Sequence, residues 1–136
     1  KIILAKEKNL SSIDVWGDGK QTRSFMYIDD CLKGTKKLFD SDCSDSLNIG
    51  SEEQVSINEM IDIISEIADY KVKKNYQLDK PKGVRGRSSD NSLIREKINW
   101  DTAFSLKSGL ELTYKWIYDQ IKNNSSSNTK KYTTSY

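Results

Sequence analysis

Histidine is absent from the sequence, and cysteine and proline are scarce. Without histidine, the chain lacks the side chain that most often acts as a general base near neutral pH and binds transition metals. Cys31 and Cys43 are too few and too irregularly placed for a disulfide framework or a zinc site. Any chemistry must therefore use lysine, tyrosine, cysteine, carboxylates or a cofactor, and we expect no metal site.

Charge of one sign and long hydrophobic runs are also lacking. The formal net charge is +2, with basic residues interspersed among acidic ones, so we expect no nucleic-acid partner. No apolar run approaches the roughly 20 residues that a membrane-spanning helix needs, and no signal-peptide pattern is present, so we expect no membrane partner. The composition is typical of one soluble globular domain. We expect a cytoplasmic protein, and the start at Lys1 without methionine leaves room for an upstream segment.

Strand and helix patterns alternate along most of the chain. The short connections between them predict an α/β domain over residues 1–122. The polar stretch 123–136, rich in serine, threonine and asparagine, predicts a disordered tail. Strands are predicted at 13–16, 23–28, 47–50 and 72–78, a loop at 80–89, and helices at 1–8, 31–39, 57–68, 92–98 and 105–121.

Capping signals mark the start of two helices. Ser56 and Glu59 have the spacing of a capping box, in which each side chain bonds the backbone amide of the other residue. Asp29 or Asp30 is expected to cap the earlier helix. The apolar face predicted for that helix consists of Cys31, Leu32, Thr35, Leu38 and Phe39.

The strand predicted at 47–50 indicates that part of a sheet is missing. It is short, apolar and flanked by helices, which is typical of a strand enclosed in a parallel sheet. The chain offers few neighbouring strands for it. We therefore expect much of that sheet to belong to an upstream segment.

Two arginine-containing segments are the main candidates for binding chemistry. A glycine turn, Gly17-Asp18-Gly19, delivers Arg23 onto a strand, and the rigid fork of arginine suits phosphate oxygens. Further on, Arg85 and Arg87 alternate with small residues in a way that could clamp an anion. On spacing alone, simpler alternatives exist, since the first segment could be a surface hairpin and the second a solvated basic loop.

Several motifs in order resemble the carboxyl-terminal signature of extended short-chain dehydrogenases that act on nucleoside-diphosphate sugars. They are Trp16 to Phe25 with Ile28-Asp29, Asn48 to Ser51, Ser56 to Glu59, and Arg85-Gly86-Arg87 with Asp90. Gly83 to Asn91 followed by Lys97 to Trp100 resembles the GDP-mannose 3,5-epimerase family in particular. The similarity spans about residues 1–121, and ordered motifs are far more specific than any one of them.

The resemblance implies both a fold and a site. The chain would be the carboxyl-terminal, substrate-binding part of such an enzyme, with a few strands of an otherwise missing Rossmann sheet. Gln21, Thr22 and Arg23 would contact the GDP-sugar. Arg87 would bind the diphosphate from the side opposite Arg23, whereas Arg85 would either contact the substrate or hold the loop. The implied substrate is GDP-mannose and the implied parent enzyme is a homodimer.

The resemblance also indicates what the chain lacks. Members of this family bind NAD on a glycine-rich turn of the Rossmann half, and use a Tyr-x-x-x-Lys pair, a cysteine and a lysine for catalysis. No glycine-rich turn of that kind occurs here. Tyr118 and Lys122 have the pair's spacing but lie at the end of a terminal helix, and Cys31 and Cys43 do not match the catalytic cysteine. We expect no catalytic or cofactor-binding residue on this chain, with NAD bound by the missing amino-terminal portion.

Two other interpretations stay open at this stage. UDP-glucose 4-epimerases, UDP-glucuronate decarboxylases and sugar-nucleotide 4,6-dehydratases share the Gly-Asp-Gly turn and its arginine, and only the loop from Arg85 to Asn91 separates them. The chain could also be a stand-alone binding module or a degenerate remnant without catalysis, because either would lack a cofactor site.

Overall fold

Helices and short strands alternate in the computed structural model, which describes residues 1–126 and so confirms the α/β prediction. None of the helices in that part of the chain is long and apolar enough to cross a membrane. In chain order the elements are α1 (Ile2–Glu7), β1 (Ser12–Trp16), β2 (Thr22–Ser24), α2 (Ile28–Phe39), β3 (Gln54–Ser56), α3 (Ile57–Ile67), β4 (Lys73–Gln77), β5 (Gly86–Arg87), α4 (Ser92–Ile98) and α5 (Leu106–Ser126).

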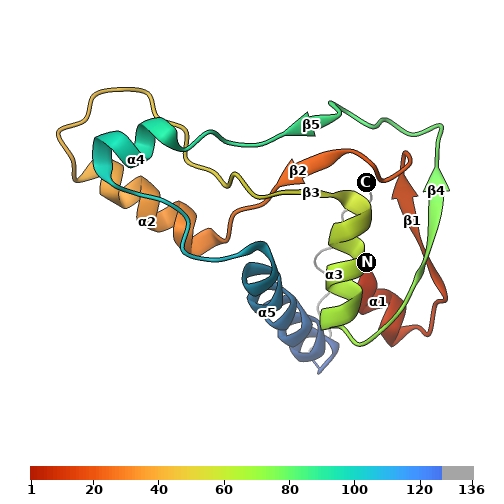
Figure 1. Cartoon of the computed structure of the whole chain (residues 1–136). Helices are drawn as coiled ribbons and strands as arrows, with labels where there is room; N and C mark the ends of the chain where they lie inside the picture. Colours follow the sequence, from red (N-terminus) through yellow and green to blue (C-terminus); the bar gives the residue numbers. More distant parts are fainter. Residues whose placement is uncertain (127–136) are drawn as a thin grey trace.

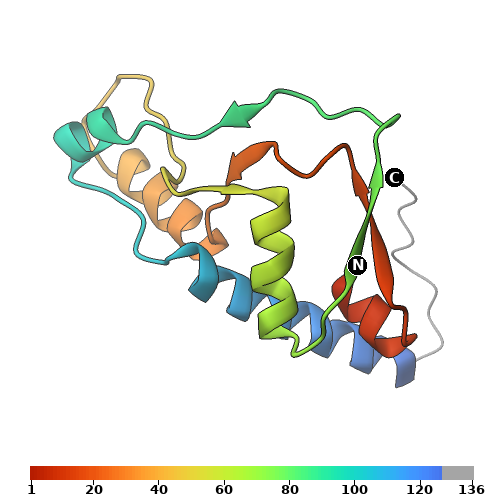
Figure 2. The same cartoon turned by 45° about the vertical axis from the view of Figure 1, so that its right-hand side comes forward.

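The strands form two small sheets. β1 and β4 pair in parallel, with Val15 opposite Tyr76. In the second sheet β2 lies in the middle, antiparallel to β3 and parallel to β5. Figure 1 shows this second sheet as a bridge between α2 and α4 at one end of the molecule and α1, α3, β1 and β4 at the other. The long helix α5 runs beneath the bridge towards α1 (Figure 2).

Each end of the molecule has its own hydrophobic cluster. Near α1 and α3, the buried residues are Ile2, Ala5, Ile13, Val15, Ile61 and Ala68. Near α4, the buried residues are Ile94, Ile98 and Trp100. Because the bridging sheet lies between these clusters, β3 leads into the cluster near α3 and the residues after β5 lead into the cluster near α4.

The capping box predicted for α3 is present. Ser56 Oγ accepts from the Glu59 amide at 3.1 Å, and Glu59 Oε2 accepts from the Ser56 amide at 2.8 Å. The predictions of β1, β4 and α4 are also confirmed, with α4 covering the predicted residues 92–98. These elements share strong local signals, which explains why the sequence alone located them.

The start of α2 differs from the prediction. The strand expected at 23–28 ends at Ser24, and α2 begins at Ile28 after Tyr27, so neither Asp29 nor Asp30 is its cap. Asp30 is only 1% exposed, and its Oδ2 accepts from the amides of Ala103 and Phe104, each at 3.0 Å. The carboxylate therefore holds a distant segment against α2 instead of capping the helix.

The apolar face predicted for α2 was also wrong in part. Leu32 and Phe39 are 60% and 86% exposed, whereas Asp30 and Gly34 are buried. Gly34 packs against Trp100, where an added Cβ would come within 2.7 Å of the indole ring. The contacts made by these two small or polar residues turn the helix so that part of its apolar face points outward.

The strand predicted at 47–50 does not form. Residues 47–50 have no regular structure, and Leu47 and Ile49 pack against the cluster near α4. A strand needs a neighbour to complete its hydrogen bonds, and no strand of the described residues pairs with this segment. The loop predicted at 80–89 in turn contains the two-residue strand β5.

The last helix ends later than predicted. The last helix was expected to stop near Ile121, but α5 continues to Ser126, so the predicted tail begins inside the helix. The remainder of that tail, residues 127–136, lies outside the described residues, and its disorder stays a prediction.

Replacing Ile94 with alanine should lower the free energy of unfolding by about 2 to 5 kcal/mol, because it empties a closed site in the core. Ile94 is 1% exposed. Leu93, the preceding residue of α4, is 43% exposed, and Leu93→Ala should cost less than about 1 kcal/mol. Urea denaturation followed by circular dichroism measures both losses, and equal values would contradict this placement of the core.

Candidate functional site

The turn before β2 is held tightly against α3. Gly17 and Gly19 have φ values of 74° and 69°, which favour glycine. The Asn58 amide donates to Gly19 O at 3.0 Å, and Asn58 Nδ2 donates to Asp18 O at 3.1 Å. A Cβ on Gly19 would lie 2.2 Å from Asn58 Oδ1. The turn therefore fixes the point at which β2 begins.

Arg23 and Arg87, far apart in sequence, are paired residues of neighbouring strands. Arg23 on β2 lies opposite Arg87 on β5 in the parallel ladder, and the Thr22 amide donates to Arg85 O at 2.8 Å beside them. Residues opposite each other in a sheet place their side chains on the same face. The two arginines thus start side by side, whereas the sequence suggested an approach from opposite directions.

No carboxylate of the described residues forms an ion pair with Arg23, Arg85 or Arg87. The Arg23 guanidinium donates to Thr22 O at 2.6 Å and reaches towards the loop that leads into β5, where a Cβ on Gly83 would lie 3.3 Å from Nη2. Like charges directly opposite one another in a sheet are destabilising. An anion between the two guanidinium groups would remove this repulsion.

Gln21 and Thr22 do not point to the arginine pair. Gln21 Nε2 donates to Trp16 O at 3.1 Å, and its Oε1 is buried without a hydrogen-bond partner among the described residues. Thr22 Oγ1 donates to Gln54 Oε1 at 3.0 Å on the other face of β2. Gln54 Nε2 donates in turn to Ser88 Oγ at 2.9 Å. These side chains tie β2, β3 and the end of β5 together.

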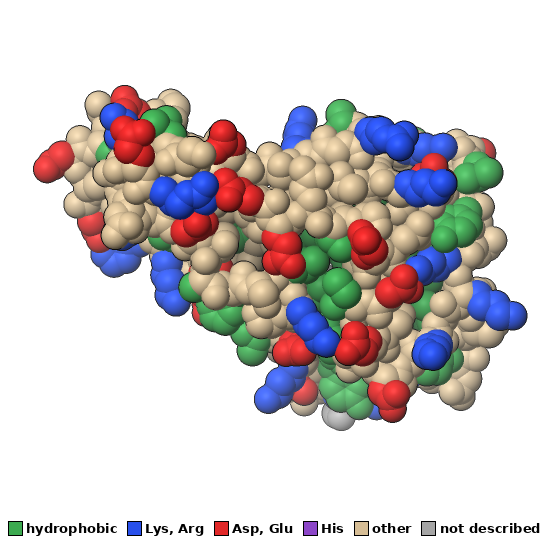
Figure 3. All heavy atoms as spheres, viewed as in Figure 1, with side chains coloured by type: hydrophobic (Ala, Val, Ile, Leu, Met, Phe, Trp, Pro, Cys, Tyr) green, Lys and Arg blue, Asp and Glu red, His purple; other side chains and the backbone are tan. Residues whose placement is uncertain are grey.

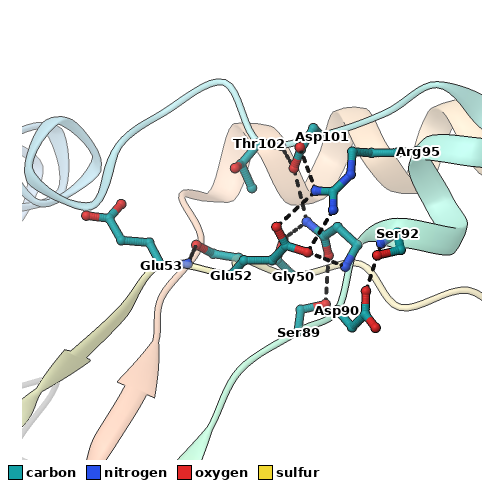
Figure 4. A network of polar contacts seen from close by, with 11 residues as sticks. Gly50, Glu52, Glu53, Ser89, Asp90, Ser92, Arg95, Asp101 and Thr102 are labelled. Atoms are coloured by element: carbon teal, nitrogen blue, oxygen red, sulfur yellow. Dashed lines mark hydrogen bonds and ion pairs between the residues drawn. The ribbon is translucent and has the colours of Figure 1, made fainter.

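A polar network follows β5 and links it to the segment before β3 (Figure 4). Its centre is Asn91, which is fully buried. The Asn91 amide donates to Glu52 Oε1 at 2.8 Å, and its side chain donates to Gly50 O at 2.9 Å and to Asp101 Oδ1 at 3.1 Å. Ser89 Oγ donates to Asn91 Oδ1 at 2.7 Å. All hydrogen-bonding groups of this side chain are therefore used.

Arg95 completes the network by binding two carboxylates. Its guanidinium contacts Glu52 through two bonds of 3.0 Å and Asp101 through one of 2.9 Å. Hydrogen bonds from Arg95 and Asn91 lower the pKa of Glu52, and the same carboxylates raise the pKa of Arg95. Burial by itself would raise the pKa of Asp101, but hydrogen bonds from Asn91 and Arg95 outweigh it and lower the pKa.

Sequence reasoning missed most of this network. Glu52, Gln54, Arg95 and Asp101 were not singled out, and Asn91 was noted only as part of a motif. The partners of Arg95 lie 43 residues upstream and 6 residues downstream, so no local spacing marks the contact. The one available signal was the motif around Asp90 and Asn91, whose role is structural here.

A cavity of about 560 Å³ lies between α1, β1, α3 and α5, away from the arginine pair. Its walls are mostly aliphatic, with Ile2, Val15, Ile61 and Ile64 among the lining residues, and Gln21 at one side. No group of three or more histidine, cysteine or acidic side chains in the described part of the chain is arranged to hold a metal ion. Lys122, which has the spacing of the catalytic pair with Tyr118, binds Glu7 at 2.9 Å.

Basic side chains are unevenly distributed over the face of the molecule shown in Figure 3. On the face shown in Figure 3, basic and acidic groups are mostly interspersed, and basic groups are most numerous near the connection between β4 and β5. That connection leads directly to Arg85 and Arg87. The candidate site is therefore a local basic region on a chain of nearly balanced charge.

Comparison with known proteins identifies the family. The family model described as GDP-mannose 4,6 dehydratase matches residues 1–113. The chain belongs to this family. The match contains both arginines of the pair and the entire network around Asn91, so the features described above fall within the shared region.

The curated relatives support the more specific resemblance. The chain is 49% identical over 109 residues to GDP-mannose 3,5-epimerase 1 of Oryza sativa subsp. indica, covering 80% of this chain and 29% of that protein. It is 47% identical to the GDP-mannose 3,5-epimerase of Arabidopsis thaliana, with the same shares covered. The chain thus spans 29% of the length of these relatives, which confirms similarity to one part of an epimerase.

Solved structures confirm the fold. UDP-glucuronic acid 4-epimerase from Bacillus cereus, in complex with UDP-glucuronic acid and NAD, has a TM-score of 0.78 and 30% identity, covering 88% of this chain and 38% of that one. UDP-glucose 4-epimerase from Thermotoga maritima with UDP-glucose has a TM-score of 0.75 and 26% identity, covering 81% and 36%. The small sheets here are thus a portion of an extended short-chain dehydrogenase.

Glu52→Gln should make the free energy of unfolding less dependent on pH in the acidic range. Since the folded state lowers the pKa of Glu52 below its ordinary value of 4.5, its contribution is fully present above that pH and is lost as the pH falls through the lowered pKa. The wild type should therefore be more stable than Glu52→Gln at neutral pH, with the difference shrinking below pH 4.5.

Urea midpoints measured between neutral pH and about pH 3 test this pH dependence. Glu96→Gln is a suitable control, because the one ion pair of Glu96 among the described residues is with Lys97 at the surface, at 3.8 Å. A difference between wild type and Glu52→Gln that stayed constant over this range would contradict the role given to Glu52.

Proposed function

We propose that this chain is the GDP-sugar-binding part of a NAD-dependent GDP-mannose 3,5-epimerase that forms GDP-L-galactose. The observation that carries the proposal is the pair of arginines, Arg23 and Arg87, which lie opposite one another on neighbouring strands and have no carboxylate partner among the described residues. The 49% identity to a GDP-mannose 3,5-epimerase favours a GDP-sugar as the ligand.

A diphosphate fits the chemistry of this pair. Neighbouring strands lie about 4.8 Å apart, so two guanidinium groups on one face can reach adjacent phosphate groups. Each guanidinium can form two parallel charge-assisted bonds with phosphate oxygens. Binding an anion would also remove the repulsion between the arginines. Gln21 and Thr22, whose side chains point elsewhere here, remain in the proposal as substrate contacts on the resemblance alone.

The cofactor belongs to a part of the enzyme that this chain does not contain. NAD would supply the reversible hydride transfer, while residues of this chain bind and orient the sugar nucleotide. A surface suited to receive a Rossmann portion is formed by Ile28, Leu32 and Phe39 of α2, which are exposed, and by residues 47–50, with which no strand of the described residues pairs. A homodimeric, cytoplasmic parent enzyme completes this proposal.

An enzyme acting on a UDP-sugar is the second candidate. The structural similarity to the UDP-glucuronic acid 4-epimerase of Bacillus cereus favours it, because an arginine pair would bind the diphosphate of either nucleotide. Calorimetric affinities of the full-length protein for GDP-mannose and UDP-glucuronic acid decide between the two. Tighter binding of the UDP-sugar would replace the first candidate by the second.

Arg23→Ala and Arg87→Ala in the full-length protein should each weaken GDP-mannose binding roughly ten- to hundredfold, because each removes a charge-assisted contact of about 1.5 to 3 kcal/mol. Lysine at either position should recover part of the loss, since it keeps the charge but lacks the fork.

Lys36→Ala provides the matched control for these variants. Lys36 binds Asp40 on the exposed side of α2, far from β2. Calorimetry with GDP-mannose, and separately with NAD, measures the effects. Unaltered GDP-mannose affinity in both arginine variants would show that Arg23 and Arg87 are ordinary surface charges.

The 136-residue chain by itself should neither bind NAD tightly nor epimerise GDP-mannose. It has no glycine-rich dinucleotide turn and no functional counterpart of the tyrosine–lysine pair. Calorimetry with NAD and product analysis by chromatography test this, with the full-length protein as the positive control. Turnover by the purified chain would contradict the assignment.

A further inference from the structure

We propose that Arg95 is a positioning residue that holds Arg87 in place for the diphosphate. The polar network around Asn91 connects Arg95 on α4 to the residues that follow Arg87 on β5. The inference rests on the proposed function of Arg87, and it concerns residues that do not themselves touch the ligand.

Strand β5 cannot hold Arg87 in place by its own pairing. It consists of two residues, both exposed, and its ladder with β2 has only two pairs. The preceding residues 80–85 have no regular structure and are exposed. The free-energy cost of ordering the backbone of one residue exceeds the net stabilisation from a typical hydrogen bond. A strand of two residues therefore needs additional contacts to hold it in place.

The anchors lie directly after Arg87. The Ser89 amide donates to Ser51 O at 3.2 Å, and Asn91 binds Gly50 O at 2.9 Å. These bonds attach the residues after β5 to the segment that leads into β3. Since β3 pairs with β2, which carries Arg23, the connection closes a ring from one arginine to the other.

Arg95 stabilises this connection by binding the two carboxylates, Glu52 and Asp101, that accept hydrogen bonds from Asn91. Glu52 Oε1 accepts from both the Asn91 amide, at 2.8 Å, and Arg95 Nη2, at 3.0 Å. Asp101 binds the Asn91 side chain through Oδ1 and Arg95 through Oδ2. Without the guanidinium, two negative carboxylates would converge on one buried residue, Glu52 at the backbone amide of Asn91 and Asp101 at its side chain. Their repulsion would loosen Asn91 and, with it, the end of β5.

Arg95 differs from Arg23 and Arg87 in its ion-pair partners. Arg95 has both of its partners within the chain, whereas Arg23 and Arg87 have no carboxylate partner among the described residues. The guanidinium of Arg95 is held by two carboxylates through three hydrogen bonds. The other two arginines remain available to an external anion.

The test is GDP binding to the full-length protein, measured by calorimetry for Arg95→Met, Arg87→Ala and the double variant. Arg95→Met should weaken GDP binding roughly three- to thirtyfold, as residues coupled to a site without touching its ligand do. In the Arg87→Ala background it should cause no further loss, because its effect passes through Arg87. Arg95→Lys should lie between Arg95→Met and wild type.

Two controls separate positioning from general destabilisation. Lys97→Met removes a charge from the same helix and should leave GDP affinity unchanged, because within the described part of the chain Lys97 makes only two surface ion pairs, at 3.7 and 3.8 Å. NAD affinity should stay the same in every variant. Should Arg95→Met not fold, Arg95→Gln, which also removes the positive charge and leaves Glu52 and Asp101 facing Asn91, replaces it with the same expectations.

The outcomes distinguish the two proposals. If Arg87→Ala leaves GDP affinity unchanged, the proposed function is wrong. If Arg87→Ala weakens binding but Arg95→Met does not, or if their effects multiply in the double variant, the positioning role is wrong. A fall in melting temperature with unaltered GDP affinity would likewise assign Arg95 a purely structural role.

Discussion

The pairing of β2 with two other strands is the contact on which the rest of the molecule depends. β2 has only three residues, yet it bonds β3 on one side and β5 on the other. Each of those strands continues into a different hydrophobic cluster, at α3 and at α4. A glycine turn fixed by Asn58 sets where β2 begins, so the alignment of the whole bridge follows from one short segment.

What the sequence revealed about the fold depended on how local each signal was. Ser56 and Glu59 are three residues apart, and their capping box was correctly predicted together with α3. The prediction of a strand at 47–50 was wrong, because a strand forms only beside a hydrogen-bonded neighbour and no described strand pairs with this segment. Asp30 looked like a helix cap, but its partners are amides 73 and 74 residues away. No spacing rule reaches that far.

The candidate site divides in the same way. Arg23 and Arg87 were selected from motif resemblance, and the ladder between β2 and β5 makes them neighbours. Their relative direction was not predictable, because it depends on strand register. The network of Asn91 and Arg95 was not predictable either, since its members become adjacent only when three separate segments fold together. The resemblance to a known family identified the arginines suited to bind a ligand, whereas the residues that hold them in place became apparent only in the folded structure.

The outward face of α2 has a consequence for how the chain behaves in concentrated solution. Ile28, Leu32 and Phe39 are spaced so that they line one side of the helix, and all three are largely exposed. A net charge of +2 provides little colloidal repulsion between molecules. Two molecules that meet along this stripe bury apolar surface at small electrostatic cost. The stripe on α2 therefore favours contact with another apolar surface wherever it is left uncovered.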